Sequence, residues 1–285
     1  MEEIIISMEA TCDLPKEIIE KHNFQIVNMD FMINDEVYST GTDNVKSTNL
    51  YEKMKNGSKT STSQVNEQLY TDFFEEQLKS GKKILHIAFS SGLSKTYDCA
   101  VKSASVLNQK YGQKIYVVDS LCACSGHGFL GILASEYVEK AKDINDLVNY
   151  VEKIKMQVCH DFTVDNLKYL AAGGRVKATT AFVGNILNIK PIMKMDNEGH
   201  LCSCSKVISR KKSLTTLYKQ FFNKKDNDCK VIFISHADSL DDAMVIYNLV
   251  KENTDFEPIV TDLGPVIGSH SGPGTIALFY LSDKR

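Results

Sequence analysis

The chain has 285 residues, of which 43% are hydrophobic and 24% are charged, and its formal net charge is −3. This composition is ordinary for a soluble globular protein, and the charge gives no reason to expect nucleic acid or an anionic membrane as a partner. A chain of this length is longer than the chains that usually fold around a single hydrophobic core, so we expect two domains. No segment approaches the length of a membrane span and the acidic start does not resemble a secretory signal, so we predict a cytoplasmic protein.

Short apolar segments alternate with amphipathic ones through the first half of the chain. We expect strands at 3–7, 25–32, 84–89 and 115–119, with Asp13 capping a first helix. Further helices are expected at 50–55, 67–79, 96–108, 126–141 and before residue 156. Such alternation is typical of a mostly parallel sheet wound with helices, so we predict an α/β domain over residues 1–157.

Two polar segments lie at expected helix starts. The first follows the strand at 84–89 and contains Ser90, Ser91, Gly92, Ser94 and Thr96. A helix start leaves backbone N–H groups unpaired, and hydroxyl groups can donate beside them, so this junction favours an anion site over simple capping. The second, Lys59–Gln64, reads by itself as a capping segment. Because such junctions can share one edge of a parallel sheet, both segments can belong to one site.

The second half has a different pattern. Asp165 is expected to cap a helix ending at the turn Gly173–Gly174, which presents Arg175, and another helix is expected at 179–187. Strands at 192–195 and 200–207 form a hairpin, and the remaining elements are helices at 214–223 and 240–253 and strands at 230–235, 257–261 and 277–281. We therefore predict an α+β domain with a largely antiparallel sheet over residues 158–285.

The segment 262–274 contains four glycines and two prolines, which predict a rigid, irregular loop before the last strand. His270 lies near its centre between Ser269 and Ser271. Because loops held by a scaffold tend to carry function and histidine can change charge near neutral pH, His270 is a candidate site residue.

Eight cysteines are present, and without a secretory signal we expect them to be reduced thiols. Two C-x-C pairs, Cys122–Cys124 and Cys202–Cys204, have His127 and His200 close by in sequence. Structural zinc sites usually show wider cysteine spacing, so we predict no metal site and no resident cofactor. No phosphate-binding loop or dinucleotide fingerprint occurs.

Four of these segments together resemble the DegV family, whose best-understood members are the FakB subunits of bacterial fatty acid kinase. They are Thr62-Ser63-Gln64, the Ser90–Tyr97 segment, the run from Asp165 to Pro191, and the segment Gly264–Gly274. The resemblance runs in order along nearly the whole chain. It implies a two-domain protein that holds one long-chain fatty acid between its domains.

The resemblance also implies roles for particular residues. Thr62, Ser94 and His270 would hold the carboxylate, with Ser63, Ser91 and Ser269 as further candidates, and Arg175 would support phosphoryl transfer by a separate FakA-type kinase. The chain would then be a lipid carrier and no enzyme itself, and nothing demands more than a monomer. Two departures from the family pattern occur: Met8-Glu9-Ala10 differs from the first motif at the end of a strand, and Lys95 replaces the usual glycine in the loop after Ser94. Neither change involves Thr62, Ser94 or His270.

Two other functions fit parts of the same pattern. A serine hydrolase would use Ser94 as nucleophile, Asp238 or Asp262, and His270, in the chain order of the α/β-hydrolases, although the final glycine of the nucleophile elbow is missing. A regulatory or scaffold protein without a ligand is the third possibility, since fold alone does not determine function.

Overall fold

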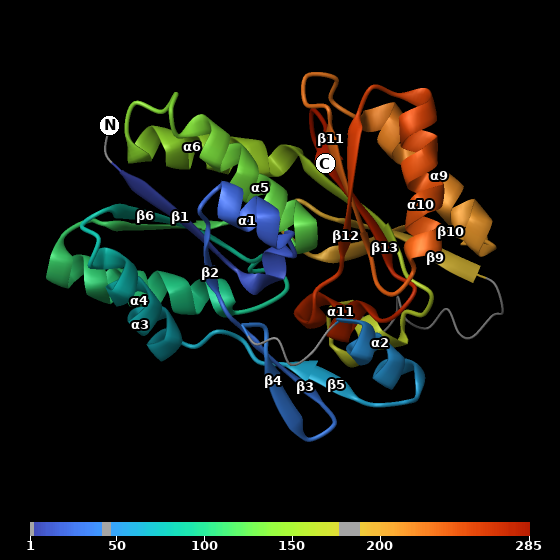
Figure 1. Cartoon of the computed structure of the whole chain (residues 1–285), viewed down its shortest axis with the longest axis horizontal. Helices are drawn as coiled ribbons and strands as arrows, with labels where there is room; N and C mark the ends of the chain where they lie inside the picture. Colours follow the sequence, from blue (N-terminus) through green and yellow to red (C-terminus); the bar gives the residue numbers. More distant parts are fainter. Residues whose placement is uncertain (1–2, 42–46, 177–188) are drawn as a thin grey trace.

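The computed structural model describes residues 3–41, 47–176 and 189–285, shown in Figure 1. The expected helix at 179–187 lies outside the described residues. The elements of the first half are β1 (Ile4–Glu9), the short 3-10 helix η1 (Ala10–Cys12), α1 (Lys16–Lys21), β2 (Gln25–Val27), β3 (Asp30–Ile33), β4 (Glu36–Ser39), α2 (Ser47–Lys55), β5 (Thr60–Thr62), α3 (Glu67–Leu78), β6 (Lys83–Ala88), α4 (Thr96–Tyr111), β7 (Ile115–Asp119), α5 (Cys124–Tyr137), α6 (Ile144–Ile154) and η2 (Lys155–Gln157).

The second half continues with strands and helices around another sheet. Its elements are β8 (Val158–Thr163), α7 (Lys168–Ala172), β9 (Ile189–Met195), β10 (Leu201–Ile208), α9 (Arg210–Lys224), β11 (Val231–His236), α10 (Leu240–Asn253), β12 (Glu257–Asp262), α11 (Pro265–Ser271) and β13 (Ile276–Leu281).

A four-stranded parallel sheet with the order β2-β1-β6-β7 forms the first half. Helices α3 and α4 pack on one face and α5 and α6 on the other (Figure 1). β6 is almost wholly buried, because a parallel sheet with helices on both faces has no polar side. The predicted parallel α/β arrangement is confirmed.

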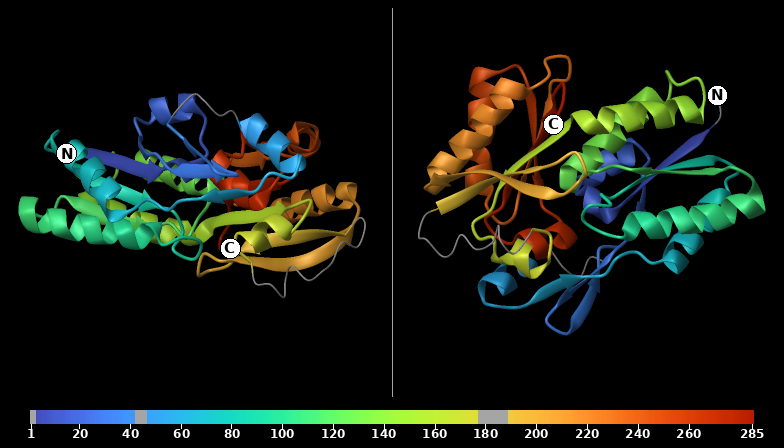
Figure 2. Two further views of the ribbon diagram at one scale, coloured as in Figure 1. Left: turned by 90° about the horizontal axis from the view of Figure 1, so that it is seen from below. Right: turned by 180° about the vertical axis from the view of Figure 1, so that it is seen from behind.

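A six-stranded sheet with the order β10-β9-β8-β13-β11-β12 forms the second half, and only β11 and β12 pair in parallel. This confirms the predicted antiparallel character. Helices α9 and α10 pack on this sheet, while α5 contacts both β1 of the first sheet and β8, β11 and β13 of the second (Figure 2). The first eleven residues of α5 are all buried, as expected for a helix that is covered on all sides.

A small antiparallel sheet, β4-β3-β5, is absent from the sequence prediction. The Lys59–Gln64 segment, expected as a helix cap, instead pairs Thr60, Ser61 and Thr62 with β3. The cap of α3 is Asn66, whose side chain accepts from the backbone N–H of Leu69. A run of consecutive Thr and Ser residues suits an edge strand as well as a helix cap, so the local sequence could not distinguish the two.

Three further local predictions were wrong. The expected irregular loop at 262–274 contains the helix α11, because Pro265 fits the first helical turn and glycines at 264 and 272 bound the helix. Asp13 does not cap the start of α1, whose N-cap is Pro15; it is instead the C-cap of η1, with a left-handed backbone (φ 46°). Asp165 does not cap α7 and instead pairs with Lys190 at 2.7 Å.

In the part of the chain that the structure describes, no helix combines the length and the apolar character needed to cross a bilayer. The strands of the two smaller sheets all precede residue 157, and those of the six-stranded sheet all follow it. The predicted domain limits of 1–157 and 158–285 remain a prediction.

Candidate functional site

A cavity of about 520 Å³ is lined by residues from both halves of the chain. Polar side chains gather among its lining residues from the end of β5 and the two residues after it, the β6–α4 loop, α11 and the turn after α7: Thr62, Ser63, Gln64, Ser94, Arg175 and His270. Apolar side chains supply much of the remaining wall: Phe89, Phe162, Met195, Leu201, Ala277 and Phe279. A cavity of this size with a few polar groups is typical of a small-molecule site.

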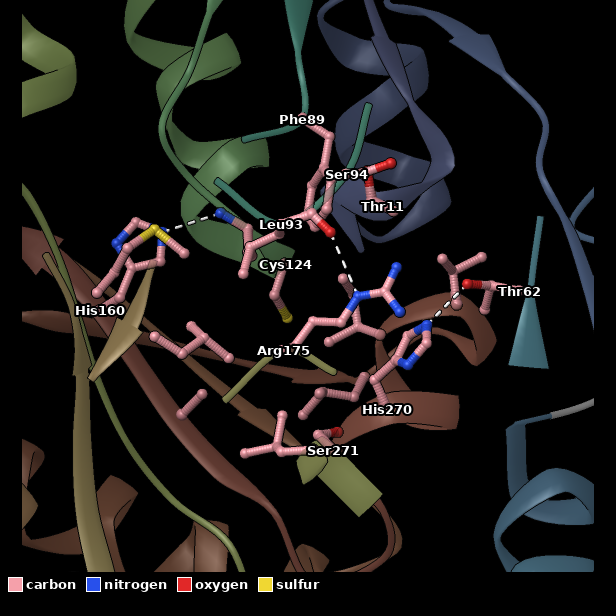
Figure 3. A pocket seen from close by; sticks show the side chains of 18 of the residues that line it. Thr11, Thr62, Phe89, Leu93, Ser94, Cys124, His160, Arg175, His270 and Ser271 are labelled. Atoms are coloured by element: carbon pink, nitrogen blue, oxygen red, sulfur yellow. Dashed lines mark hydrogen bonds between the residues drawn. The ribbon is translucent and has the colours of Figure 1, made fainter. Parts of the chain in front are cut away.

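The structure brings Thr62, Ser94 and His270 to this one cavity (Figure 3). The hydroxyl of Thr62 lies 2.7 Å from Nε2 of His270, joining residues 208 positions apart in sequence. In the family resemblance these three residues bind one carboxylate, and their position on one cavity is compatible with that role.

His270 is neutral at pH 7. Burial, together with the charge of Arg175, lowers the pKa of His270 to about 4. A neutral imidazole has one N–H donor, which suits hydrogen bonding to an anion without supplying a counter-charge. The ring packs closely on Gly173, where an added Cβ would come within 2.3 Å of Nδ1 of His270. The first glycine of the Gly-Gly turn therefore makes room for the histidine.

Ser94 is held by the start of α4. Its hydroxyl oxygen accepts from the backbone N–H of Thr96 at 3.2 Å and lies 2.8 Å from the Thr96 hydroxyl. When Thr96 donates in that pair, the Ser94 proton is free to face the cavity. The hydroxyl of Ser90 is not available to a ligand, because it donates to the carbonyl of Gly199 at 2.9 Å. This hydrogen bond connects the β6–α4 loop to the β9–β10 hairpin.

The three less certain candidates do not share one environment. Ser63 and Ser91 line the cavity, and both are exposed. Ser269 is buried on α11, and its hydroxyl donates to the backbone carbonyl of Pro265 at 2.7 Å. That hydrogen bond occupies the hydroxyl within its own helix, and Ser269 is not among the residues lining the cavity.

Arg175 extends into the cavity from the turn after α7 (Figure 3). Its Nε donates to the carbonyl of Leu93 at 3.3 Å and its Nη1 donates to that of Gly173. The side chain is half-buried, and burial lowers the pKa of the guanidinium, which stays charged at pH 7. This places a cation beside the neutral His270.

The residues of the alternative hydrolase triad are not assembled. His270 contacts Thr62, and Ser94 contacts Thr96. Asp262 faces His236 at 3.5 Å, and Asp238 pairs with Lys55 at 2.5 Å. No hydrogen bond among the described residues connects the proposed nucleophile, base and acid, so the geometry gives no support to a hydrolase.

The two cysteine pairs lie in different surroundings. Cys122 and Cys124 are buried, and Cys122 accepts a hydrogen bond from Arg285 at 2.9 Å. Cys202 and Cys204 lie on β10, where Cys202 is half-buried and Cys204 is exposed. Over the described ranges, no three histidine, cysteine, aspartate or glutamate side chains come together as a metal site would require.

The family departure at Glu9 has a structural explanation that sequence reasoning missed. Glu9 is fully buried and accepts hydrogen bonds from the hydroxyl of Tyr70, from Nε2 of His86 at 3.1 Å and from the backbone N–H of Phe89 at 2.9 Å. Phe89 lines the cavity. Glu9 therefore lies behind the cavity wall and anchors the strand end that leads to Ser94. An acidic residue at the end of a largely apolar strand was the available signal.

Comparison with known proteins gives a consistent result. The DegV family model matches residues 3–283. A DegV domain-containing protein of Clostridium perfringens is 35% identical over all of this chain and 99% of its own length. Among solved structures, DegV of Bacillus subtilis, described as a fatty acid binding protein, has a TM-score of 0.85 and 26% identity, covering 99% of this chain and 100% of its own. A DegV family protein of Thermus thermophilus, whose structure describes fatty acid binding, has a TM-score of 0.88 and 24% identity, with coverage of 99% and 100%.

Proposed function

This chain belongs to the DegV family, and from that premise we propose that it binds one long-chain fatty acid and presents it to a separate kinase. The carboxylate would be held by Thr62, Ser94 and His270, and the tail would lie along the apolar wall of the same cavity. The single observation that carries the proposal is this cavity, in which hydroxyl and imidazole donors and a large apolar wall occur together.

The energetics of such a complex are dominated by the tail. Burying about fourteen methylenes at about 0.8 kcal/mol each gives on the order of 11 kcal/mol before the costs of association. Hydrogen bonds to an ionised carboxylate are stronger than neutral ones and depend on direction, so the polar residues would determine orientation. Arg175 supplies the positive charge that the neutral His270 lacks.

Phosphoryl transfer would require a second protein, because the chain carries no phosphate-binding loop. In the proposed step a carboxylate oxygen attacks the γ-phosphorus of ATP held by the kinase, and the bond to ADP breaks. The products are an acyl phosphate on this carrier and ADP. Arg175 would stabilise the charge on the transferred group, as cations do in phosphoryl transfer.

Native mass spectrometry of the purified protein, followed by lipid extraction, tests the binding proposal. We expect one fatty acid per chain, or stoichiometric uptake of an added acid such as hexadecanoic acid. A protein that carries no lipid and takes up none would contradict the proposal and favour the ligand-free scaffold.

Ser94→Ala is expected to weaken fatty acid binding by about 1–3 kcal/mol, because the buried carboxylate loses one donor. The dissociation constant for hexadecanoic acid, measured by displacement of a fluorescent fatty acid, checks this. Ser105→Ala is the matched control, since Ser105 is an exposed serine of α4, the helix that follows Ser94. If both variants bind like the wild type, the carboxylate is held elsewhere.

Arg175→Ala is expected to lower acyl phosphate formation by a FakA-type kinase far more than it lowers fatty acid binding. Lost charge stabilisation in a transition state typically costs a hundredfold or more, on the order of 3 kcal/mol. Acyl phosphate trapped as a hydroxamate gives the rate, and the displacement assay gives the affinity. Lys168→Ala, an exposed cation of α7, is the control. Equal losses of rate and affinity would contradict the separate role of Arg175.

A further inference from the structure

The charged residues that line the cavity are both cations, Lys95 and Arg175. The two histidines in the wall, His160 and His270, are neutral at pH 7 because burial lowers the pKa of each ring. Among the described residues, no aspartate or glutamate lines the cavity. The wall therefore carries two positive charges, whereas the ionised carboxylate of a fatty acid supplies one negative charge.

Lys95 lies at the open, polar end of the cavity. It directly follows Ser94, and it is the N-cap residue of α4. The exposed residues among those that line the cavity are all polar: Ser63, Gln64, Ser91 and Lys95. A ligand whose carboxyl group is held by Ser94 would therefore direct that group towards solvent and towards Lys95.

Arg175 is attached to the same loop. Its Nε donates to the carbonyl of Leu93 at 3.3 Å, and Leu93 precedes Lys95 by two positions. In the view of Figure 3, the Arg175 guanidinium lies between Leu93 and His270. Lys95 comes from the first half of the chain and Arg175 from the second, so the two cations approach the polar end of the cavity from different elements.

The ammonium group of Lys95 forms no ion pair or hydrogen bond with any described residue. The other two lysines of α4 are paired, Lys102 with Glu67 and Lys110 with Glu75, each at 3.0 Å. A cation at the N-terminus of a helix opposes the helix dipole, so an unpaired lysine there is locally unfavourable. Departures from such local rules are expected at functional sites. An anion held beside Lys95 would compensate for this one.

We propose that Lys95 joins Arg175 in binding a phosphate head group, so that this chain holds a long-chain acyl phosphate more tightly than the corresponding fatty acid. The inference rests on the proposed function, since it concerns the product of the same site. A phosphate monoester carries about −1.5 to −2 charges at pH 7, which matches two cations better than a carboxylate does. Arginine contacts phosphate through its planar fork, and lysine contacts it as a mobile point charge.

The test compares dissociation constants for hexadecanoic acid and monohexadecyl phosphate, a stable phosphate monoester, on the full chain by displacement of a fluorescent fatty acid. We expect the wild type to bind the phosphate about tenfold more tightly, the effect of roughly one charged hydrogen bond. Lys95→Gln is expected to lower this ratio about fivefold, and Lys95→Arg, which keeps the charge, to preserve it. Because Lys95 is exposed, added salt should reduce the ratio in the wild type more than in Lys95→Gln.

Lys211→Gln is the matched control, because Lys211 is an exposed lysine of α9 that does not line the cavity. Its ratio is expected to equal that of the wild type. A wild-type ratio of one or less, a ratio unchanged in Lys95→Gln, or an equal loss in Lys211→Gln would overturn the inference while leaving fatty acid binding intact. Tighter binding of hexadecanoyl glycerol phosphate than of monohexadecyl phosphate would also overturn it, by assigning the two cations to a lysophospholipid. If the wild type binds none of these ligands, the proposed function itself fails.

Discussion

Glu9→Gln is expected to lower the free energy of unfolding at pH 7 by about 3 kcal/mol, the cost of disrupting a buried, fully paired charge. The carboxylate accepts from Tyr70, His86 and the backbone of Phe89. A glutamine amide turns one acceptor into a donor, which then faces another donor. Urea denaturation of the two proteins measures the difference. The exposed Glu17→Gln in α1 is the control and should change stability by less than about 0.5 kcal/mol.

The same substitution predicts a change in pH dependence. Burial alone would raise the pKa of Glu9, but the His86 and His127 rings and the Tyr70 hydroxyl outweigh it and lower the pKa to about 2. Because the folded-state pKa lies below the ordinary value of 4.5, the stabilisation is complete above that pH and is lost as the pH falls towards 2. The Glu9→Gln protein should therefore lose less free energy of unfolding than the wild type as the pH falls from 4.5 towards 2. If the free energy of unfolding falls equally in both proteins between pH 5 and 2, Glu9 is not the titrating group.

The network around Glu9 shows where sequence reasoning stops. Strand β6 could be predicted because its apolar run is a local pattern, and the parallel sheet followed from the alternation of such runs. Tyr70 and His86 lie 61 and 77 positions from Glu9, and nothing in the local sequence indicates that they meet. Side-chain pairing across strands and helices depends on register, which the fold determines.

In the polar part of the site, the residues could be predicted from the sequence, but the elements that carry them could not. Thr62, Ser94, Arg175 and His270 were named from motifs, and they do line one cavity. Their supporting elements were mistaken: Thr62 lies on an edge strand and His270 on a helix, where a cap and an irregular loop were expected. Glycine and proline end and start helices as readily as they form loops, so their density alone could not distinguish the two.

The apolar wall could not be predicted, because its residues look like ordinary core. Ala277 belongs to the last strand, an unbroken buried run that fits any central strand. It pairs in register with Phe162 of β8 and Ser235 of β11, and it lines the cavity. Whether a small residue leaves space or fills it depends on what the opposite elements place there, which is a property of the packed molecule.

Ala277→Phe is expected to abolish tight binding of long acyl chains by filling the space that the tail needs. If the added ring displaces about four methylenes, each worth about 0.8 kcal/mol, binding of hexadecanoic acid falls by about 3 kcal/mol, or roughly a hundredfold or more. Octanoic acid, which leaves part of the apolar wall unused, should lose much less affinity. Displacement titrations with both acids on both proteins give the comparison.

Comparing the affinities for hexadecanoic and octanoic acid distinguishes a blocked tail site from a destabilised protein. Ala277→Val adds only two methyl carbons and should produce an intermediate loss for hexadecanoic acid, because partial filling displaces fewer methylenes. An overpacked core would instead lower the melting temperature and weaken both acids equally. Undiminished hexadecanoic acid binding by a folded Ala277→Phe protein would place the tail elsewhere, since the ring and the chain cannot occupy the same volume.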